Sequence, residues 1–265
     1  MNLNHLISIV GAGPGDPELL TIRALHRIEQ ANVILYDALH GDEILKLASE
    51  KTLKIYAGKH YQDGQHQTER QDRINSQLKQ FAEEGKRVVR LKAGDPFIFG
   101  RGAEELEFCL SGGLNVEVVP GITAGLAAAA GFHIPVTLRG INSMVLFYTG
   151  HKRGEGFADT AVVASVLKTD APVMVYMGLK NLILLTDELI KLGVPEDLPL
   201  QIISRAGHPD QAICTSSLKG TAAFLAGAEP PMPAIILMGK CARQLSGDYA
   251  IIPRTLPEHA TCPND

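Results

Sequence analysis

Clustered cysteines, an excess of positive charge and long apolar runs are all lacking from this sequence of 265 residues. The four cysteines are scattered with no Cys-x-x-Cys pair, which is typical of a reducing compartment and argues against a zinc or other metal site. The net charge of −4 argues against general nucleic-acid binding, although it leaves room for a local basic pocket. No apolar run reaches the roughly 20 residues that span a bilayer, so we expect no membrane segment. The first residues also lack the pattern of a signal peptide, and we therefore expect a cytoplasmic protein.

What is present is the composition of an ordinary globular protein, with 45% hydrophobic and 20% charged residues. The first half alternates short apolar strands with helical patterns, which predicts a mainly parallel sheet. A hinge is expected at residues 120–123, and the second half shows strands joined by more hairpin-like connections. We therefore predict an α/β protein with an N-terminal domain at 1–119, a C-terminal domain at 120–245 and a poorly ordered tail at 246–265.

The first of two glycine-rich turns, GAGPGDP at residues 11–17, follows an apolar strand. Asp16 and Pro17 are suited to the N-cap and first position of a helix, so we predict that a helix starts here. A dinucleotide-binding fingerprint would need glycine where Asp16 stands, and a carboxylate beside a pyrophosphate is unfavourable, which argues against NAD or FAD. A tight structural turn and a ligand-binding turn both remain open at this point.

The second turn belongs to the stretch VVRLKAGDPFIFGRGAEE at residues 88–105. It begins as a buried strand, breaks at residues 93–96 and, after an apolar segment, enters a helix at residues 100–102. Glycine, aspartate and proline at the carboxyl end of a strand are typical of a ligand site, because open α/β sheets form their crevices there. Two other strands end in Asp37 and Lys59, each of which could be a solvated charge or a catalytic group. The alanine-rich residues 124–131 allow close backbone approach, either to another helix or to a ligand.

Taken together, these motifs resemble a known family. GAGPGDPELLT, ILYDAL, AGK, RLKAGDPFIFGRGAEE, VPGITA, TGH, VYMG and PAIILMG occur in the order and approximate spacing of the uroporphyrinogen-III C-methyltransferases, which belong to the tetrapyrrole methylases. The resemblance covers about residues 6–243. No part of the chain resembles the dehydrogenase/ferrochelatase portion of fused sirohaem synthases, so we expect a monofunctional enzyme.

The resemblance implies two α/β domains with S-adenosylmethionine in a cleft between them, the class III methyltransferase fold, and a homodimer. It implies Asp37 as proton acceptor, Lys59 as proton donor, and Arg101 as a further catalytic residue. His66 and Glu104 are expected on the substrate side. The residues expected to contact the cofactor come from both halves of the chain: Pro14, Ala93, Gly94, Asp95, Ile98, Thr123, Ala124, Met177 and Ala206.

The implied activity is methylation of uroporphyrinogen III at carbons 2 and 7 to give precorrin-2. A sulfonium methyl donor needs no metal, and the transfer depends mostly on alignment of donor and nucleophile. The alternatives are a methylase that acts on a later precorrin and a cofactor-binding homologue without turnover. Two departures from the family pattern bear on substrate choice, because Ala38 replaces a common arginine and Ala93 a common glycine. The many carboxylates of the substrate call for local cations: Lys59, His60, His66, Arg101, Arg139, His151, Lys152 and Arg153.

Overall fold

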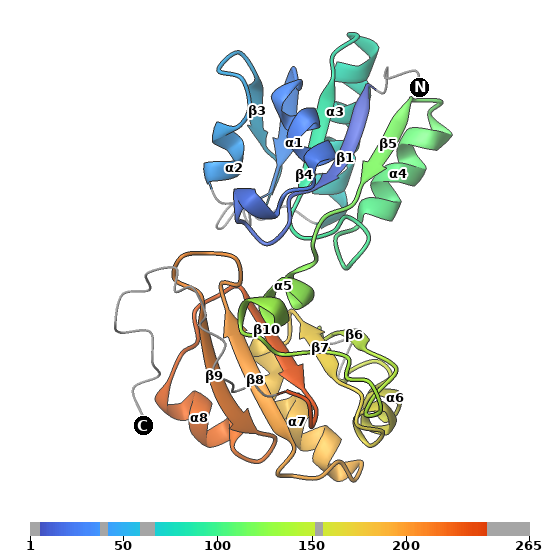
Figure 1. The fold of residues 1–265 in the computed structure, drawn as a ribbon. Helices are drawn as coiled ribbons and strands as arrows, with labels where there is room; N and C mark the ends of the chain where they lie inside the picture. The colour runs from blue at the N-terminus through green and yellow to red at the C-terminus, as the bar shows by residue number, and fades with distance from the viewer. Residues whose placement is uncertain (1–5, 38–41, 59–66, 152–155, 243–265) are drawn as a thin grey trace. The chain divides into compact units, whose positions relative to one another are not determined.

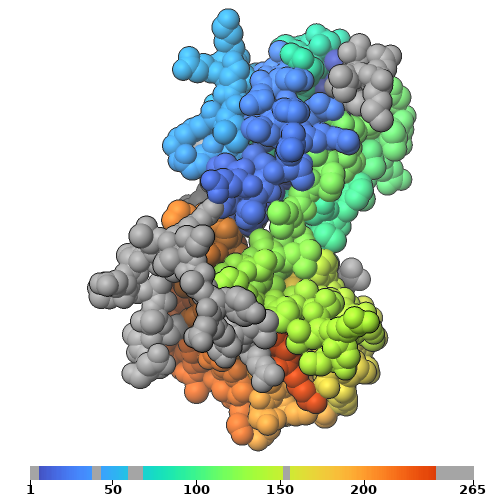
Figure 2. Space-filling model, in the orientation of Figure 1, coloured from blue at the N-terminus to red at the C-terminus, as the bar shows by residue number. Residues whose placement is uncertain are grey.

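A computed structural model describes residues 6–37, 42–58, 67–151 and 156–242 of the chain. The chain divides into two compact units, Met1–Ala124 and Gly125–Asp265. Each unit contains one five-stranded sheet with helices packed against it, so the fold is mixed α/β (Figure 1). In each unit buried apolar side chains fill the space between these elements. Figure 2 shows the atoms at the surface of one face, coloured along the chain.

All strands of the N-terminal sheet are parallel, and their order is β3-β2-β4-β1-β5. The strands are β1 (Ile7–Gly11), β2 (Val33–Tyr36), β3 (Leu53–Tyr56), β4 (Val88–Lys92) and β5 (Val116–Val119). The helices are α1 (Ile22–Glu29), α2 (Asp42–Lys46), α3 (Gln67–Glu83) and α4 (Gly102–Ser111). This order places β1 and β4 next to each other in the sheet, so the two glycine-rich turns that follow them emerge side by side at its carboxyl edge.

Two apolar clusters cover the two faces of this sheet. One joins α1 and α2 to inward-facing residues such as Val89 and Leu91 of β4. The other joins α3 and α4 to residues such as Val88 of the same strand. Because side chains alternate along a strand, Arg90 and Lys92 lie on the face of Val88, beneath α3 and α4. Two cations are thereby buried between the sheet and these two helices.

The prediction that a helix starts at Asp16 and Pro17 is confirmed for a short 3₁₀ helix, but it is wrong for the long helix that follows. Asp16 does accept a hydrogen bond from the backbone of Glu18, but it caps only a short 3₁₀ turn at Pro17–Leu19. The helix α1 begins at Ile22, where the Thr21 hydroxyl accepts from the backbone N–H of Ala24 over 3.1 Å. A threonine cap was available five residues later, and it is the cap of the longer helix.

The C-terminal unit has a mixed sheet of order β6-β7-β10-β8-β9, in which only the β6–β7 pair is parallel. The strands are β6 (Leu146–Thr149), β7 (Val173–Tyr176), β8 (Pro199–Ser204), β9 (Ala212–Ser217) and β10 (Ala234–Met238). The helices are α5 (Ala124–Gly131), α6 (Thr160–Leu167), α7 (Leu182–Lys191) and α8 (Thr221–Gly227). The first residue of α5 is the last of the N-terminal unit, so this helix begins at the junction.

One apolar cluster forms the core of the C-terminal unit, where α6, α7 and α8 cover one face of the sheet. Helix α5 approaches the other face, since the backbone N–H of Gly125 donates to the Tyr176 hydroxyl over 2.9 Å. A Cβ at Gly125 would lie 2.5 Å from that hydroxyl oxygen and 2.8 Å from the sulfur of Met174, so a larger residue would force these side chains to shift. Within the described ranges, no helix is long and apolar enough to cross a membrane.

Candidate active site

Three loops meet at the carboxyl edge of the N-terminal sheet, after β1, β4 and β5. The loops after β1 and β4 pair through two backbone hydrogen bonds between Gly13 and Gly94, with N–O distances of 3.2 and 2.8 Å. Both glycines have positive φ angles, +68° and +64°, which side chains with a Cβ rarely adopt. Gly13 and Gly94 therefore pair as bare backbone at the sheet edge, and we call these paired loops the loop platform.

Asp95 ties the loop after β4 to the loop after β5. Its Oδ1 accepts from the backbone N–H of Phe97 over 2.8 Å, and its Oδ2 accepts from the backbone N–H of Gly121 over 3.1 Å. The contact is tight, because a Cβ at Gly121 would lie 2.3 Å from the carbonyl oxygen of Gly94. Asp95 is thus a brace for the platform, with both of its carboxylate oxygens engaged by backbone.

Beyond Asp95 the loop after β4 is apolar, exposed and strained. Phe97 and Phe99 are both exposed. Phe99 and Arg101 adopt left-handed backbone conformations, with φ angles of 54° and 59°, although neither is glycine. Such strain persists only where the surroundings impose it, and it is concentrated at ligand and catalytic sites.

Arg101 and Glu104 form an ion pair at the start of α4. The Nε of Arg101 donates to Oε1 of Glu104 over 2.9 Å, and its terminal nitrogen donates to Oε2. The hydrogen bond to Arg101 lowers the pKa of Glu104, and the same bond raises the pKa of Arg101. Both side chains are partly exposed, so the pair adds little to stability and is easily opened by a competing anion.

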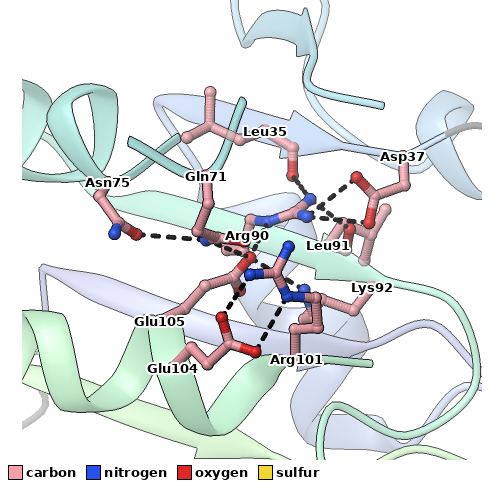
Figure 3. A network of polar contacts seen from close by, with 10 residues as sticks. All are labelled: Leu35, Asp37, Gln71, Asn75, Arg90, Leu91, Lys92, Arg101, Glu104 and Glu105. Atoms are coloured by element: carbon pink, nitrogen blue, oxygen red, sulfur yellow. Dashed lines mark hydrogen bonds and ion pairs between the residues drawn. The ribbon is translucent and has the colours of Figure 1, made fainter. Parts of the chain in front are cut away.

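A buried polar network lies behind this edge and ends at Asp37 (Figure 3). At its centre is Arg90, which is 2% exposed. One terminal nitrogen of Arg90 donates to both carboxylate oxygens of Asp37, at 2.9 and 2.8 Å. Its Nε donates to Oε1 of Glu105 over 3.0 Å, and the same oxygen accepts from Nζ of Lys92 over 2.9 Å. The network therefore contains two cations and two carboxylates.

Burial acts differently on the two cations. Burial lowers the pKa of Arg90, but the charges of Glu105 and Asp37 outweigh that effect and the net shift is upward. Burial also lowers the pKa of Lys92, and the nearby positive charge of Arg90 adds to this, so that the net shift is downward despite Glu105. Arg90 is therefore the fixed cation of the network, and Lys92 is the one that deprotonates more readily.

In the C-terminal unit, the residues predicted to contact the cofactor lie where β7 and β8 end. Met177 follows β7 and is 55% exposed, with a left-handed φ of 53°. Ala206 follows β8 and is buried. Both strands pair with β10 in the antiparallel direction, so they run parallel to each other. Met177 and Ala206, which follow them, therefore lie at the same edge of this sheet.

A hollow of about 540 Å³ opens in the same unit, in the size range of small-molecule pockets. It begins two residues after Met177 and is mostly apolar, with Lys180 and Glu229 at its wall. The lining residues come from the segment after β7 and from the connection between α8 and β10: Leu179, Lys180, Leu225, Ala226, Gly227, Ala228, Glu229, Pro230 and Met232.

The sequence-predicted site residues of the N-terminal unit fall into several groups in the structure. Gly94 and Asp95 belong to the loop platform, and a Cβ at Gly94 would lie 3.5 and 3.6 Å from backbone atoms of Ala124 and Thr123. Asp37 joins the buried network, and Arg101 pairs with Glu104. Lys59 and His66, together with Ala38, His60, Lys152 and Arg153, lie outside the described residues. The remaining predicted contacts, Pro14, Ala93 and Ile98, are partly exposed residues of the loops after β1 and β4.

Sequence reasoning missed Arg90, Lys92 and Glu105. A signal was present, because two cations occur at alternate positions of an otherwise apolar strand and so point to one buried face. Buried cations require a partner, and a glutamate on the following helix is a natural one. The sequence did not show which glutamate of Gly102–Ser111 faces the sheet; Glu104 is exposed and Glu105 is fully buried.

Comparison with known proteins identifies the family. Residues 6–222 match the model of the tetrapyrrole (corrin/porphyrin) methylases, which is most of the chain. The chain therefore belongs to this family, and the fold predicted from the resemblance, an α/β protein with two sheets, is confirmed.

Three relatives illustrate the similarity. The S-adenosyl-L-methionine-dependent uroporphyrinogen III methyltransferase of Arabidopsis thaliana is 40% identical over 88% of this chain and 63% of its own length. The siroheme synthase of Nitrosospira multiformis is 42% identical over 88% of this chain and 48% of its own length. A uroporphyrin-III C-methyl transferase from Thermus thermophilus, solved with S-adenyl homocysteine, aligns with a TM-score of 0.75 and 36% identity, covering 89% of this chain and 97% of that one. The chain thus spans between about half and two thirds of these two curated relatives, and nearly all of the solved structure.

Proposed function

We propose that this chain transfers methyl groups from S-adenosylmethionine to uroporphyrinogen III, at carbons 2 and 7, to give precorrin-2. The observation that carries the proposal is the 40% identity, over 88% of the chain, to a plant enzyme named for that donor and that substrate. The described part of the site supports it, because Asp37, Gly94, Asp95 and Arg101 stand together at the carboxyl edge of one parallel sheet.

The loop platform fits a cofactor that lies against backbone. Gly13 and Gly94 present main chain without side chains, and Asp95 holds the adjoining loop in place. In the C-terminal unit, the exposed thioether of Met177 offers an apolar contact, and the adjacent hollow has room for part of a nucleoside. We assign cofactor contacts to these residues and to the others that the resemblance implies: Pro14, Ala93, Ile98, Thr123, Ala124 and Ala206. When bound, the sulfonium cofactor supplies an electrophilic methyl group.

The residues of the N-terminal unit would bind the tetrapyrrole and move its protons. Methyl transfer would form a C–C bond to a ring carbon and break a C–S bond of the sulfonium, whose sulfur would leave as a neutral thioether. The macrocycle, which takes up the positive charge, would then release a proton to Asp37. Lys59 would donate a proton where the macrocycle needs one. Arg101 would exchange its weak pairing with Glu104 for a substrate carboxylate, since guanidinium groups bind carboxylates in a two-pronged fashion. The exposed Phe97 and Phe99 would cover apolar surface of the macrocycle.

The finer expectations are also proposals. We propose that the protein works in the cytoplasm as a homodimer, and that His66 and Glu104 contact the substrate. Alignment of donor and nucleophile supplies most of the rate in such a transfer, so a metal is not required. The product would serve any pathway that begins from precorrin-2.

The test is an assay under anaerobic conditions with purified protein, uroporphyrinogen III and S-adenosylmethionine, read by mass spectrometry. Two added methyl groups are expected from the unaltered protein, and none from Asp37→Asn. Calorimetry with S-adenosylhomocysteine should be run beside it. Cofactor binding without methylation of uroporphyrinogen III would contradict the proposal. Methylation of a later precorrin, supplied in its place, would then identify the alternative substrate. No methylation of any tetrapyrrole would identify a non-catalytic homologue.

A further inference from the structure

We propose that Arg90 is a positioning residue that sets the orientation of the Asp37 carboxylate, and that Glu105 holds Arg90 in place. This inference rests on the proposed function, in which Asp37 accepts a proton. It assigns a role to a buried network that the proposed mechanism does not otherwise use (Figure 3).

The first observation is that every nitrogen of the Arg90 guanidinium has an acceptor. Five acceptor atoms lie within hydrogen-bond distance of its three nitrogens. Two of these are the oxygens of Asp37 and one is Oε1 of Glu105. The remaining two are the backbone carbonyls of Leu35 and Leu91, at 3.3 and 3.2 Å. A planar group held at all three nitrogens has little freedom to rotate, so it constrains the groups that it binds.

The second observation concerns Asp37, which is the freer member of the pair. It follows the last residue of β2, and its side chain is 30% exposed whereas that of Arg90 is 3% exposed. Among the described residues, only Arg90 donates a hydrogen bond to the Asp37 carboxylate. The orientation of this carboxylate at the sheet edge is therefore set from below, by one terminal nitrogen of Arg90. The exposed part of the side chain leaves the carboxylate accessible to a proton.

The third observation is that Glu105, which holds Arg90, is buried with one oxygen unsatisfied within the described part of the chain. Glu105 is fully buried, and its Oε1 accepts from Arg90, from Lys92 and, at 3.4 Å, from Gln71. Its Oε2 is buried and finds no hydrogen-bond partner among the described residues. A buried carboxylate with an unsatisfied oxygen is a poor contributor to stability, and a well-packed apolar group would serve the core as well. This favours a role in the site over a role in stability alone.

Lysine cannot replace arginine in this arrangement. The ammonium group has three donors that diverge from one atom, whereas Arg90 reaches Asp37 and Glu105 through different nitrogens. In Arg90→Lys the charge is kept, but the ammonium group reaches at most one of the two carboxylates. Glu105 still has Lys92 as a partner, whereas Asp37 has no other donor among the described residues. A carboxylate displaced by about 1 Å costs on the order of a hundredfold in rate.

The test compares Arg90→Lys with Arg27→Lys. Arg27 is the control, because it is an arginine of the same unit that also pairs with a carboxylate. Its partner is Glu117 on β5, which is separated from β2 and Asp37 by two strands of the sheet. In Arg90→Lys we expect kcat to fall about a hundredfold, with the KM for both substrates and the affinity for S-adenosylhomocysteine unchanged. In Arg27→Lys we expect kcat to stay at its original value. Circular dichroism establishes that each variant is folded.

A second variant, Glu105→Gln, tests the proposal even if Arg90→Lys fails to fold. The substitution keeps the shape and the acceptor oxygen of the side chain but removes the charge that holds both cations. We therefore expect a smaller fall in kcat, again without a change in KM. Original kcat in both network variants would overturn the proposal. A fall in kcat that is matched by a loss of cofactor affinity, or that occurs equally in Arg27→Lys, would also overturn it, because the network would then be merely structural.

The failure of the proposed function would be seen separately. If the unaltered chain binds S-adenosylhomocysteine and methylates no tetrapyrrole, the function fails, while a crystal structure of Arg90→Lys still tests the positioning. We expect the Asp37 carboxylate to turn away from its original place in that structure. An Asp37 side chain in its original orientation would overturn the inference.

Discussion

Replacing Gly121 by alanine tests whether the three loops at the carboxyl edge of the N-terminal sheet form the cofactor platform. A Cβ at this position would lie 2.3 Å from the carbonyl oxygen of Gly94 and 2.8 and 2.9 Å from the C and Cα atoms of Gly11. Ordinary contacts begin at 3.4 Å, so the backbone must open by about 1 Å. All three neighbours are backbone atoms, and no side-chain rotation can relieve the overlap.

The magnitude follows from the cost of overpacking, which is typically about 1–3 kcal/mol. We expect the loops after β1, β4 and β5 to separate in the free protein, with loss of the bond from Gly121 to Asp95. If cofactor binding requires the loops to close again, the same energy is subtracted from the binding free energy. That corresponds to a Kd for S-adenosylhomocysteine that is higher by roughly 5- to 150-fold.

The assay is isothermal titration calorimetry, with chemical denaturation to follow stability. Gly156→Ala is the control, because a Cβ there meets no described atom within 4 Å, and we expect it to leave both quantities unchanged. An unchanged Kd for Gly121→Ala, together with reduced stability, would refute the assignment of these loops to the cofactor. An unchanged stability would refute the packing argument itself.

Three further predictions concern single side chains. Asp95→Ala removes the acceptor for two backbone N–H groups, so we expect cofactor affinity by calorimetry to fall about tenfold, with a smaller loss in Asp95→Asn. Unchanged affinity would contradict the role of Asp95 in holding the cofactor loops together. Arg101→Ala should abolish turnover while cofactor binding is retained, and a fully active variant would remove Arg101 from the mechanism. Burial raises the pKa of Cys109 to about 11, so at pH 8 only about 0.1% of this thiol is the reactive thiolate. Peptide mapping after iodoacetamide treatment should find Cys109 unmodified in the folded protein at pH 8, with labelling that increases about tenfold per pH unit up to pH 11; rapid labelling at pH 8 would contradict its burial.

Much of the fold could be predicted from the sequence, because the alternation of apolar strands and amphipathic helices is strong in the first half. The carboxyl-edge location of Gly94 and Asp95 followed from the break after a buried strand. The start of α1 was less predictable, since Asp16 and Thr21 are both good caps and only tertiary packing decides which one precedes the long helix.

The electrostatic part of the site was harder to predict. Periodicity places Arg90 and Lys92 on one face of β4, but it does not say which side chains of α3 and α4 come within hydrogen-bond distance of them. The partner of Asp37 lies 53 positions further along the chain, on the neighbouring strand. Such pairings depend on strand order, β2 beside β4, which a local pattern does not encode.

The proposed activity of this chain is methyl transfer to a reduced tetrapyrrole, which acts as the nucleophile. The most direct measurement supplies S-adenosylmethionine with a deuterated methyl group to the purified protein and uroporphyrinogen III under anaerobic conditions, and follows the product by mass spectrometry. We expect successive addition of two labelled methyl groups to the macrocycle. An unlabelled tetrapyrrole, from protein that binds S-adenosylhomocysteine in the same buffer, would contradict it.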